Sequence, residues 1–167
     1  IQTPILPEND DSADLLRGYQ QFVQSIKTTS FPSSIPKNDA LLPVSPGNLW
    51  VFGKNNKFAE QLKAQLIQYN VRIDDQGISL DTKTFQWENH SFVFTLNRND
   101  LNSNQVTWVV ASSGESIPGL IRKLPHYGKY GYLVFKGNTP DNIAKGAWPS
   151  SKSGLYRTFE EGVYDLP

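Results

Sequence analysis

The chain contains no cysteine and no methionine. The first absence excludes disulfide bonds, thiolate metal sites and cysteine nucleophiles, and it is compatible with any cellular compartment. A complete translated chain starts with methionine, so the second absence leads us to expect a processed product or an excised domain. No signal peptide is visible at Ile1, which indicates that any targeting segment has already been removed.

The chain also has no net charge at pH 7, because its 16 basic and 16 acidic residues balance. A balanced chain is a poor match for nucleic acid or for an anionic membrane, since both favour a net basic partner. No apolar run approaches the roughly 20 residues that cross a bilayer, so no transmembrane segment is expected. The two histidines, His90 and His126, have neither HxH nor HExxH spacing and no carboxylate cluster beside them. The sequence therefore predicts no metal site.

What remains is the composition of a soluble globular protein, with 38% hydrophobic residues in a chain of 167. That length suits one domain with an added arm. We expect an N-terminal helix and Pro-rich connector over 1–47 and an α/β core over 48–137. An irregular C-terminal extension over 138–167 would pack on the core or on a partner.

Apolar residues at helical spacing between Leu15 and Ile26 predict an amphipathic helix over roughly 12–27, with Ser12 among the candidate N-caps. The apolar stripe of this helix either covers the domain's own sheet or docks on a neighbouring domain. Four prolines between Thr28 and Gly47 argue against a regular element there.

The core reads as a series of short apolar strands with two helices between them. The predicted strands are 49–52, 71–73, 77–80, 85–87, 91–96, 106–111 and 130–135. One helix has Asn55 or Asn56 as its predicted N-terminal cap and ends near Asn70, which suits a left-handed C-terminal cap. The other follows Ser112, whose spacing to Glu115 fits a capping box, and ends before Pro125. Residues 140–146 suggest one further helical turn.

The strongest of these strands are solid apolar runs rather than alternating ones, which is typical of parallel strands that are buried on both faces. We therefore expect a small three-layer α/β domain with a mostly parallel sheet, flavodoxin-like or Rossmann-like in outline. The N-terminal helix would be an added arm. In such folds ligands bind beyond the carboxyl ends of the strands.

Two strand-to-helix loops, 53–57 and 112–116, would open at that edge of the sheet. Free N–H groups at a helix N-terminus favour an anion, and nearby lysines would add charge. The candidate contact residues for a cofactor or another small ligand are Lys54, Asn55, Ser112, Ser113 and Ser116. Neither loop has a GxGxxG or GxxxxGK[ST] motif, so turn formation and capping are the competing interpretation.

A serine nucleophile is a further possibility that the spacing excludes. A nucleophile elbow is GxSxG, whereas Gly114-Glu115-Ser116 is followed by Gly119, one place too late. His126 lies ten residues after Ser116 at the far end of the same predicted helix. At about 1.5 Å per residue it is beyond hydrogen-bond reach. The sequence therefore predicts no catalytic residue.

Residues 124–137 read LPHYGKYGYLVFKG, and residues 142–148 read NIAKGAW. Together they resemble a block near the C-terminus of bacterial zinc aminopeptidase-like proteins of the gluzincin, aminopeptidase N-like family. In that block a strand and a short helix precede LPHYGKYSYL-type sequence, and an N-x-x-KG-x-W element follows. The resemblance covers residues 106–148, about a quarter of the chain by motif.

In that family the zinc ligands, HExxH and a downstream glutamate, belong to a separate thermolysin-like domain, and this chain has no HExxH. The resemblance therefore implies a non-catalytic accessory or interaction domain of a larger zinc aminopeptidase-like protein. It implies a neighbouring peptidase domain as partner, zinc only in that domain, and a periplasmic or extracellular setting.

Two alternatives stay open. In the first, the chain is a small-molecule or nucleotide-binding α/β module that uses the loops 53–57 and 112–116. In the second, aromatic residues of the C-terminal extension recognise a peptide, namely Trp148, Tyr156, Phe159 and Tyr164.

Overall fold

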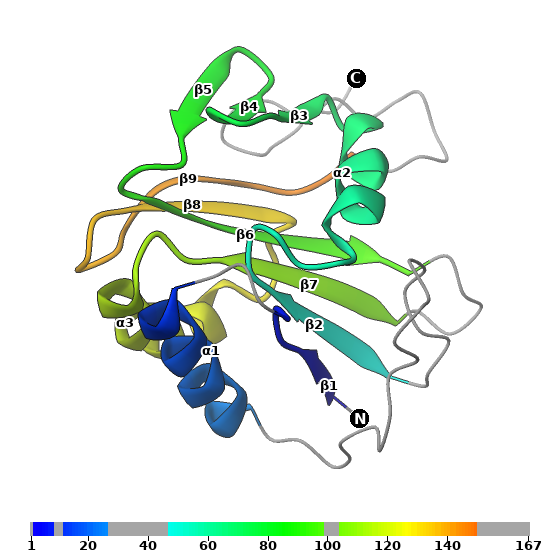
Figure 1. Ribbon diagram of the computed structural model, residues 1–167. Helices are drawn as coiled ribbons and strands as arrows, with labels where there is room; N and C mark the ends of the chain where they lie inside the picture. Colours follow the sequence, from blue (N-terminus) through cyan, green and yellow to red (C-terminus); the bar gives the residue numbers. More distant parts are fainter. Residues whose placement is uncertain (1, 9–11, 27–46, 99–103, 150–167) are drawn as a thin grey trace.

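The computed structural model describes residues 2–8, 12–26, 47–98 and 104–149 (Figure 1). The predicted connector lies outside these ranges except for Gly47, and so does Lys27 at the end of the predicted N-terminal helix. Tyr156, Phe159 and Tyr164 of the predicted extension also lie outside the described residues.

The described part consists of strands, three α-helices and two short 3-10 helices. The helices are α1 (Ala13–Ser25), α2 (Ala59–Ile67) and α3 (Ile117–Lys123), with the 3-10 helices η1 (Gly114–Ser116) and η2 (Leu124–Tyr127). The strands are β1 (Gln2–Ile5), β2 (Asn48–Phe52), β3 (Val71–Ile73), β4 (Gly77–Leu80), β5 (Lys83–Gln86), β6 (His90–Asn97), β7 (Gln105–Val110), β8 (Tyr132–Lys136) and β9 (Asp141–Gly146).

The strands form two sheets. The larger has six strands in the order β1-β2-β7-β6-β8-β9, and the smaller has three in the order β3-β4-β5. Within the larger sheet β1, β2 and β7 run parallel, whereas β6, β8 and β9 each pair antiparallel with their neighbours. The small sheet is antiparallel throughout. The predicted flavodoxin-like or Rossmann-like fold with a mostly parallel sheet is therefore wrong.

The strand direction was predicted incorrectly because a solid apolar run indicates burial and not direction. Such a run shows that both faces of a strand are covered, and an antiparallel strand in the middle of a covered sheet meets the same condition. Strand β6 is the clearest example, because its residues from Ser91 to Phe94 are all buried although both of its neighbours are antiparallel. The pattern therefore predicted burial correctly and strand direction incorrectly.

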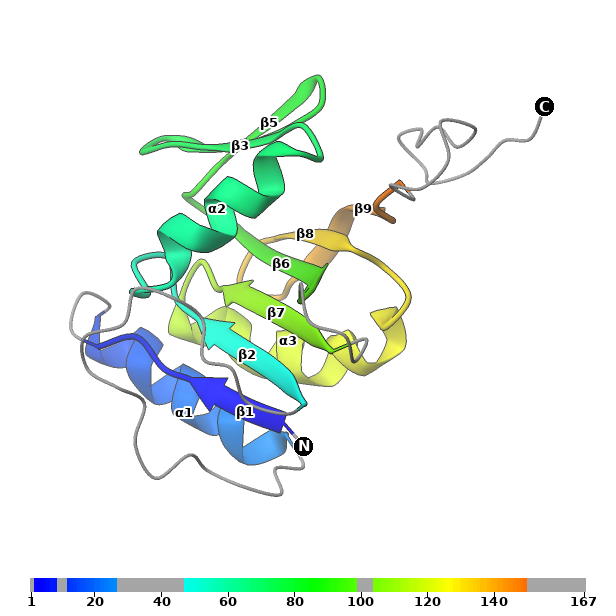
Figure 2. The same cartoon turned by 90° about the vertical axis from the view of Figure 1, so that its right-hand side faces the viewer.

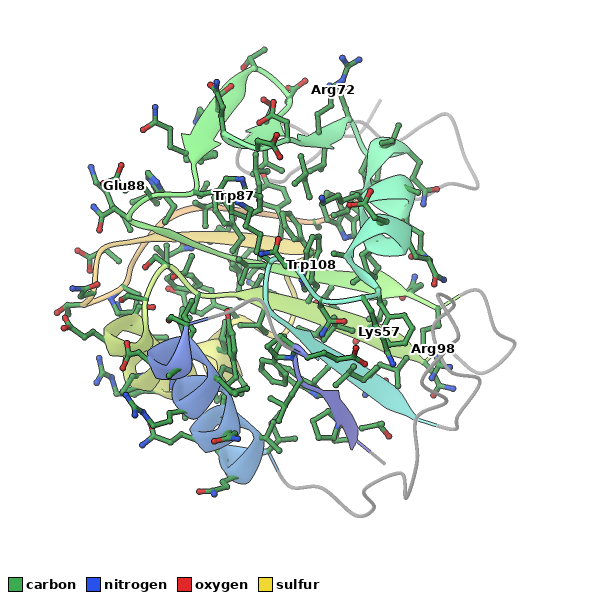
Figure 3. All side chains as sticks on the ribbon, in the orientation of Figure 1. Lys57, Arg72, Trp87, Glu88, Arg98 and Trp108 are labelled. Carbon is green, nitrogen blue, oxygen red and sulfur yellow. The ribbon has the colours of Figure 1, made fainter. Side chains whose placement is uncertain are left out.

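The six-stranded sheet is covered on both faces. Figures 1 and 2 show α1 and α3 on one side, and α2 with the small sheet on the other. One core cluster joins Leu62 of α2 and Ile78 of β4 to Trp108 in the large sheet. The second joins Tyr19 of α1 and Leu120 of α3 to the opposite face. In Figure 3 Trp108 lies near the centre of the molecule, and its indole Nε1 donates to the Gly53 carbonyl at 2.8 Å.

Helix α1 belongs to this architecture and is not an added arm. Its predicted N-cap is confirmed, because the Ser12 hydroxyl accepts a hydrogen bond from the Leu15 N–H at 3.2 Å. Tyr19 is buried, and its hydroxyl accepts from the Ala111 N–H at 3.0 Å, just after β7. The strand β1 before the helix pairs with β2. The apolar stripe thus covers the domain's own sheet, the first of the two predicted alternatives.

The predicted caps differ in detail from the observed ones. The cap of η1 is Ser113 rather than Ser112, because the Ser113 hydroxyl accepts from the Ser116 N–H at 3.3 Å. Helix α2 starts at Ala59, later than expected, and Asn56 forms the turn that leads into it. Asn70 has the predicted left-handed conformation, with φ of 61°.

The chain after β8 continues the sheet. Residues 141–146 form the edge strand β9 rather than the predicted helical turn. Trp148 then packs back on the fold, stacked on Tyr69 with a ring-centroid distance of 4.5 Å. Its indole N–H donates to the Thr95 carbonyl at 2.7 Å. The aromatic surface of this residue is therefore used within the domain.

Candidate functional site

The face of the large sheet toward α1 and α3 changes from polar to apolar along its strands. Residues two apart in a strand share a face, so pairing places side chains in rows across the sheet. The amide row is formed by Gln2, Asn48, Gln105 and Asn97; the threonine row by Trp50, Thr107 and Thr95; and the apolar row by Phe52, Val109 and Val93. These rows follow the pairing of neighbouring strands.

The helices cover only part of this face. The apolar row belongs to the core cluster that includes Tyr19, Phe22 and Leu120. Over the other two rows there is a cleft of about 520 Å³. Its lining residues are Gln2, Phe22, Ser25, Ile26, Asn48, Trp50, Val93, Thr95, Gln105, Thr107, Ile121, Leu124, Pro125, Tyr127, Gly128, Tyr130 and Leu133.

The cleft is lined by aromatic, aliphatic and uncharged polar groups. Its aromatic residues include Trp50, whose ring centroid is 5.7 Å from that of Phe22, and the pair Tyr127 and Tyr130, at 6.0 Å. Among the described residues that line it, none is acidic, basic or histidine. Two ammonium groups lie against the tyrosines of the lining. Lys145 Nζ is 5.8 Å from the ring centroid of Tyr127 and 5.3 Å from that of Tyr130, and Lys129 Nζ is 5.2 Å from that of Tyr130.

Hydrogen bonds within the fold fix several of the polar side chains. The Trp50 indole N–H donates to Gln2 Oε1 at 2.7 Å. The backbone N–H of Gln105 donates to Asn48 Oδ1 at 2.9 Å. The hydroxyls of Thr95 and Thr107 are 3.4 Å apart. The polar end of the cleft is therefore preorganised by contacts between neighbouring strands.

The two predicted strand-to-helix loops lie at the other end of the strands. Since β2 and β7 are parallel neighbours, both loops open at one edge of the sheet, as expected for their order in the chain. Lys54 Nζ lies 4.6 Å from the ring centroid of Trp87, which ties this loop toward the small sheet. Asn55 is exposed. Gly53 and Asn56 of this loop are buried, and Asn56 is 3% exposed.

The predicted serines are joined in an internal network. The Ser91 hydroxyl accepts from the Ser112 N–H at 2.9 Å and lies 3.4 Å from the Ser116 hydroxyl. Ser116 is buried and donates to the Ser113 carbonyl at 2.8 Å. The Ser113 hydroxyl donates to Asn138 Oδ1 at 2.7 Å. These contacts are those of a cap and a loop closure.

A second, more open cavity of about 550 Å³ adjoins this network. It is lined by Gln86, Glu88, Asn89, His90, Ser112, Ser113 and Asn138, a set that does not include Lys54 or Asn55. The Nδ1 of His90 lies 2.9 Å from the Gln86 carbonyl and 3.0 Å from that of Glu88, so the imidazole closes a turn. The cavity therefore does not join the two predicted loops into one site.

His126 is exposed in η2, whereas Ser116 is buried in η1, so the structure does not bring the two together as a pair. Within the described ranges, no group of three or more His, Cys, Asp or Glu residues is placed to hold a metal ion. No helix in those ranges is both long and apolar enough to cross a membrane.

The cleft residues were not predicted from the sequence. The sequence nevertheless contains a signal. When every second residue is taken, Asn48-Trp50-Phe52 and Gln105-Thr107-Val109 both begin with an amide and end with an apolar residue. Reading this change requires knowing that the two segments are neighbouring strands. Three comparisons, with protein-family models, with curated proteins and with solved structures, found no match to this chain.

Proposed function

We propose that this chain is a non-catalytic binding domain and that the cleft over the threonine row holds an uncharged, largely apolar small molecule. The observation that carries the proposal is the lining, in which aromatic and aliphatic walls meet hydroxyl and amide groups. Such a combination binds through apolar contact and orients its ligand by a few hydrogen bonds. The volume of about 520 Å³ is in the range of small-molecule sites.

The wall of the cleft comes from the same segment that carries the family resemblance. Leu124, Tyr127 and Tyr130 of that segment line the cleft, and all three lie between α3 and β8. We therefore propose that this binding domain is an accessory part of a larger zinc aminopeptidase-like protein. The test is the complete reading frame, which should encode HExxH outside this chain. Metal-dependent cleavage of an amino-acid amide by the isolated chain would contradict the non-catalytic proposal.

Filling the cleft should weaken ligand binding without unfolding the protein. Thr107 is half-buried and lines the cleft, so Thr107→Tyr places a phenol where the ligand would lie. Titration with the neutral fluorescent probe N-phenyl-1-naphthylamine should show binding to the wild type. We expect at least a tenfold weaker affinity for Thr107→Tyr, the equivalent of about 1.4 kcal/mol.

A matched control is Thr84→Tyr, because Thr84 is an exposed strand residue of the small sheet and does not line the cleft. This variant should bind the probe as the wild type does. Both variants are checked by thermal unfolding before the titration. Equal binding by Thr107→Tyr and the wild type would show that the probe binds elsewhere and would contradict the proposed site.

A further inference from the structure

The amide groups at the polar end of the cleft have a fixed orientation. An indole N–H only donates, so the atom of Gln2 that lies 2.7 Å from Trp50 Nε1 must be its carbonyl oxygen. A backbone N–H likewise only donates, so the atom of Asn48 that lies 2.9 Å from the Gln105 nitrogen must also be oxygen. The remaining end of each side chain is therefore an NH₂ group.

The described part of the fold leaves both NH₂ groups unused. Neither has a hydrogen-bond partner among the residues that the structure describes, and both side chains line the cleft. Gln2 and Asn48 are register partners on the neighbouring strands β1 and β2, so their backbones are about 4.8 Å apart. Both donors therefore belong to the polar end of the cleft, where each can donate to an acceptor group of a ligand.

We propose that the ligand of the cleft carries an uncharged carbonyl group as hydrogen-bond acceptor, bound by the NH₂ groups of Gln2 and Asn48. Its apolar body lies toward Tyr127 and Leu124, which line the cleft on the side of α3. This inference rests on the proposed function and adds the chemical class of the ligand: an aromatic or aliphatic ketone, ester or amide.

The lining favours a neutral acceptor over a carboxylate. A carboxylate loses its hydration in an apolar cleft and needs a charged partner in return. None of the described lining residues is a cation, and the ammonium groups of Lys145 and Lys129 lie against the ring of Tyr130. The hydroxyls of Thr95 and Thr107 donate or accept, so they do not decide between these ligands.

A set of four naphthalenes that differ only in the polar group tests this inference. The probes are 2-acetylnaphthalene, 1-(2-naphthyl)ethanol, 2-ethylnaphthalene and 2-naphthoate, each titrated against the bound fluorescent probe. The ketone should bind the wild type about tenfold more tightly than the hydrocarbon and more tightly than the alcohol and the carboxylate. In NMR spectra the side-chain NH₂ signals of Gln2 and Asn48 should shift with the ketone and not with the hydrocarbon.

Isosteric acids remove the donors and keep the internal contacts. In Asn48→Asp one carboxylate oxygen still accepts from the Gln105 N–H, and in Gln2→Glu one still accepts from the Trp50 indole. Each variant should bind the ketone about tenfold more weakly and should prefer the alcohol, which donates a hydrogen bond. The control is Asn97→Asp, which adds the same charge to the amide row outside the cleft lining and should leave the ketone affinity unchanged.

The outcomes separate this inference from the function on which it rests. If no naphthalene displaces the fluorescent probe and Thr107→Tyr has no effect, the cleft is not the binding site. If the naphthalenes bind in the cleft but the ketone has no advantage over the hydrocarbon, the site stands and the carbonyl assignment is overturned. A preference for 2-naphthoate, or an unchanged ketone affinity in both Asn48→Asp and Gln2→Glu, overturns it as well.

Discussion

Asn56→Asp is expected to destabilise the fold by about 3 to 4 kcal/mol. The Asn56 side chain is 3% exposed, and its Nδ2 donates to the carbonyls of Ile5 at 3.2 Å and Phe52 at 2.9 Å. Its Oδ1 accepts from the Phe58 N–H at 3.1 Å. Aspartate keeps the acceptor but turns the donor into a second oxygen, which places a buried carboxylate against two carbonyl oxygens.

The neighbouring residue gives a matched control. Asn55 is exposed, so Asn55→Asp adds the same charge to the same loop and should change stability by no more than about 0.5 kcal/mol. Urea denaturation followed by tryptophan fluorescence measures both variants. Equal stability of the two variants would show that the bridge between Ile5, Phe52 and Phe58 contributes little.

Asn56→Asp should also weaken ligand binding. Asn56 joins the last residue of β1, Ile5, to the last residue of β2, Phe52. Strand β1 carries Gln2 into the cleft, and β2 carries Asn48 and Trp50. Asn56, which lies in one of the two predicted ligand loops, therefore holds the last residues of β1 and β2 together. The first residues of the same strands line the cleft.

Local pattern predicted the elements of this fold well. The helical spacing of Leu15 to Ile26 gave α1, and the run Leu49–Phe52 lies within β2. Each of these depends on residues close together in the sequence, which is why a single segment is enough. The prediction of β9 as a helical turn failed because its short, mostly exposed segment has little apolar signal of its own and is defined by pairing with β8.

Strand direction and the candidate site could not be predicted from local sequence pattern. Strand direction depends on which segments pair, and burial on both faces is compatible with either direction. The amides that line the cleft, Gln2, Asn48 and Gln105, come from three strands spread over most of the described chain. No spacing rule joins residues so far apart. The predicted serines, by contrast, were visible as a motif, and the structure uses them in capping and in closing a loop.

Trp148→Ala is the second substitution with a large expected effect, a loss of about 3 kcal/mol. The indole stacks on Tyr69 at 4.5 Å between ring centroids, and its N–H donates to the Thr95 carbonyl at 2.7 Å. Alanine removes both contacts and leaves the part-buried Thr95 carbonyl without its donor. Trp148→Phe keeps an aromatic ring and loses only the donor, so it should cost about 1 to 2 kcal/mol, measured by urea denaturation.

Gly131 makes this prediction specific. A Cβ atom at Gly131 would lie 2.6 Å from the indole of Trp148, closer than carbon atoms approach, and Gly131 is not among the residues with positive φ. Gly131→Ala should therefore destabilise only by displacing the indole, by about 1 to 3 kcal/mol. In the Trp148→Ala background the same substitution should cost almost nothing, because the clash has been removed.

The double-mutant cycle of Trp148→Ala and Gly131→Ala also tests whether a change on one face of the sheet affects ligand binding on the other. The Thr95 carbonyl bonds Trp148, and the Thr95 side chain lines the cleft on the other face. Loss of the indole should therefore loosen the end of β6 and weaken binding of the naphthyl ketone, while Trp148→Phe should weaken it less. If Gly131→Ala lowers the free energy of unfolding equally with and without Trp148, the indole does not determine the position of the end of β6. The proposed effect of Trp148 on ligand binding in the cleft is then contradicted as well.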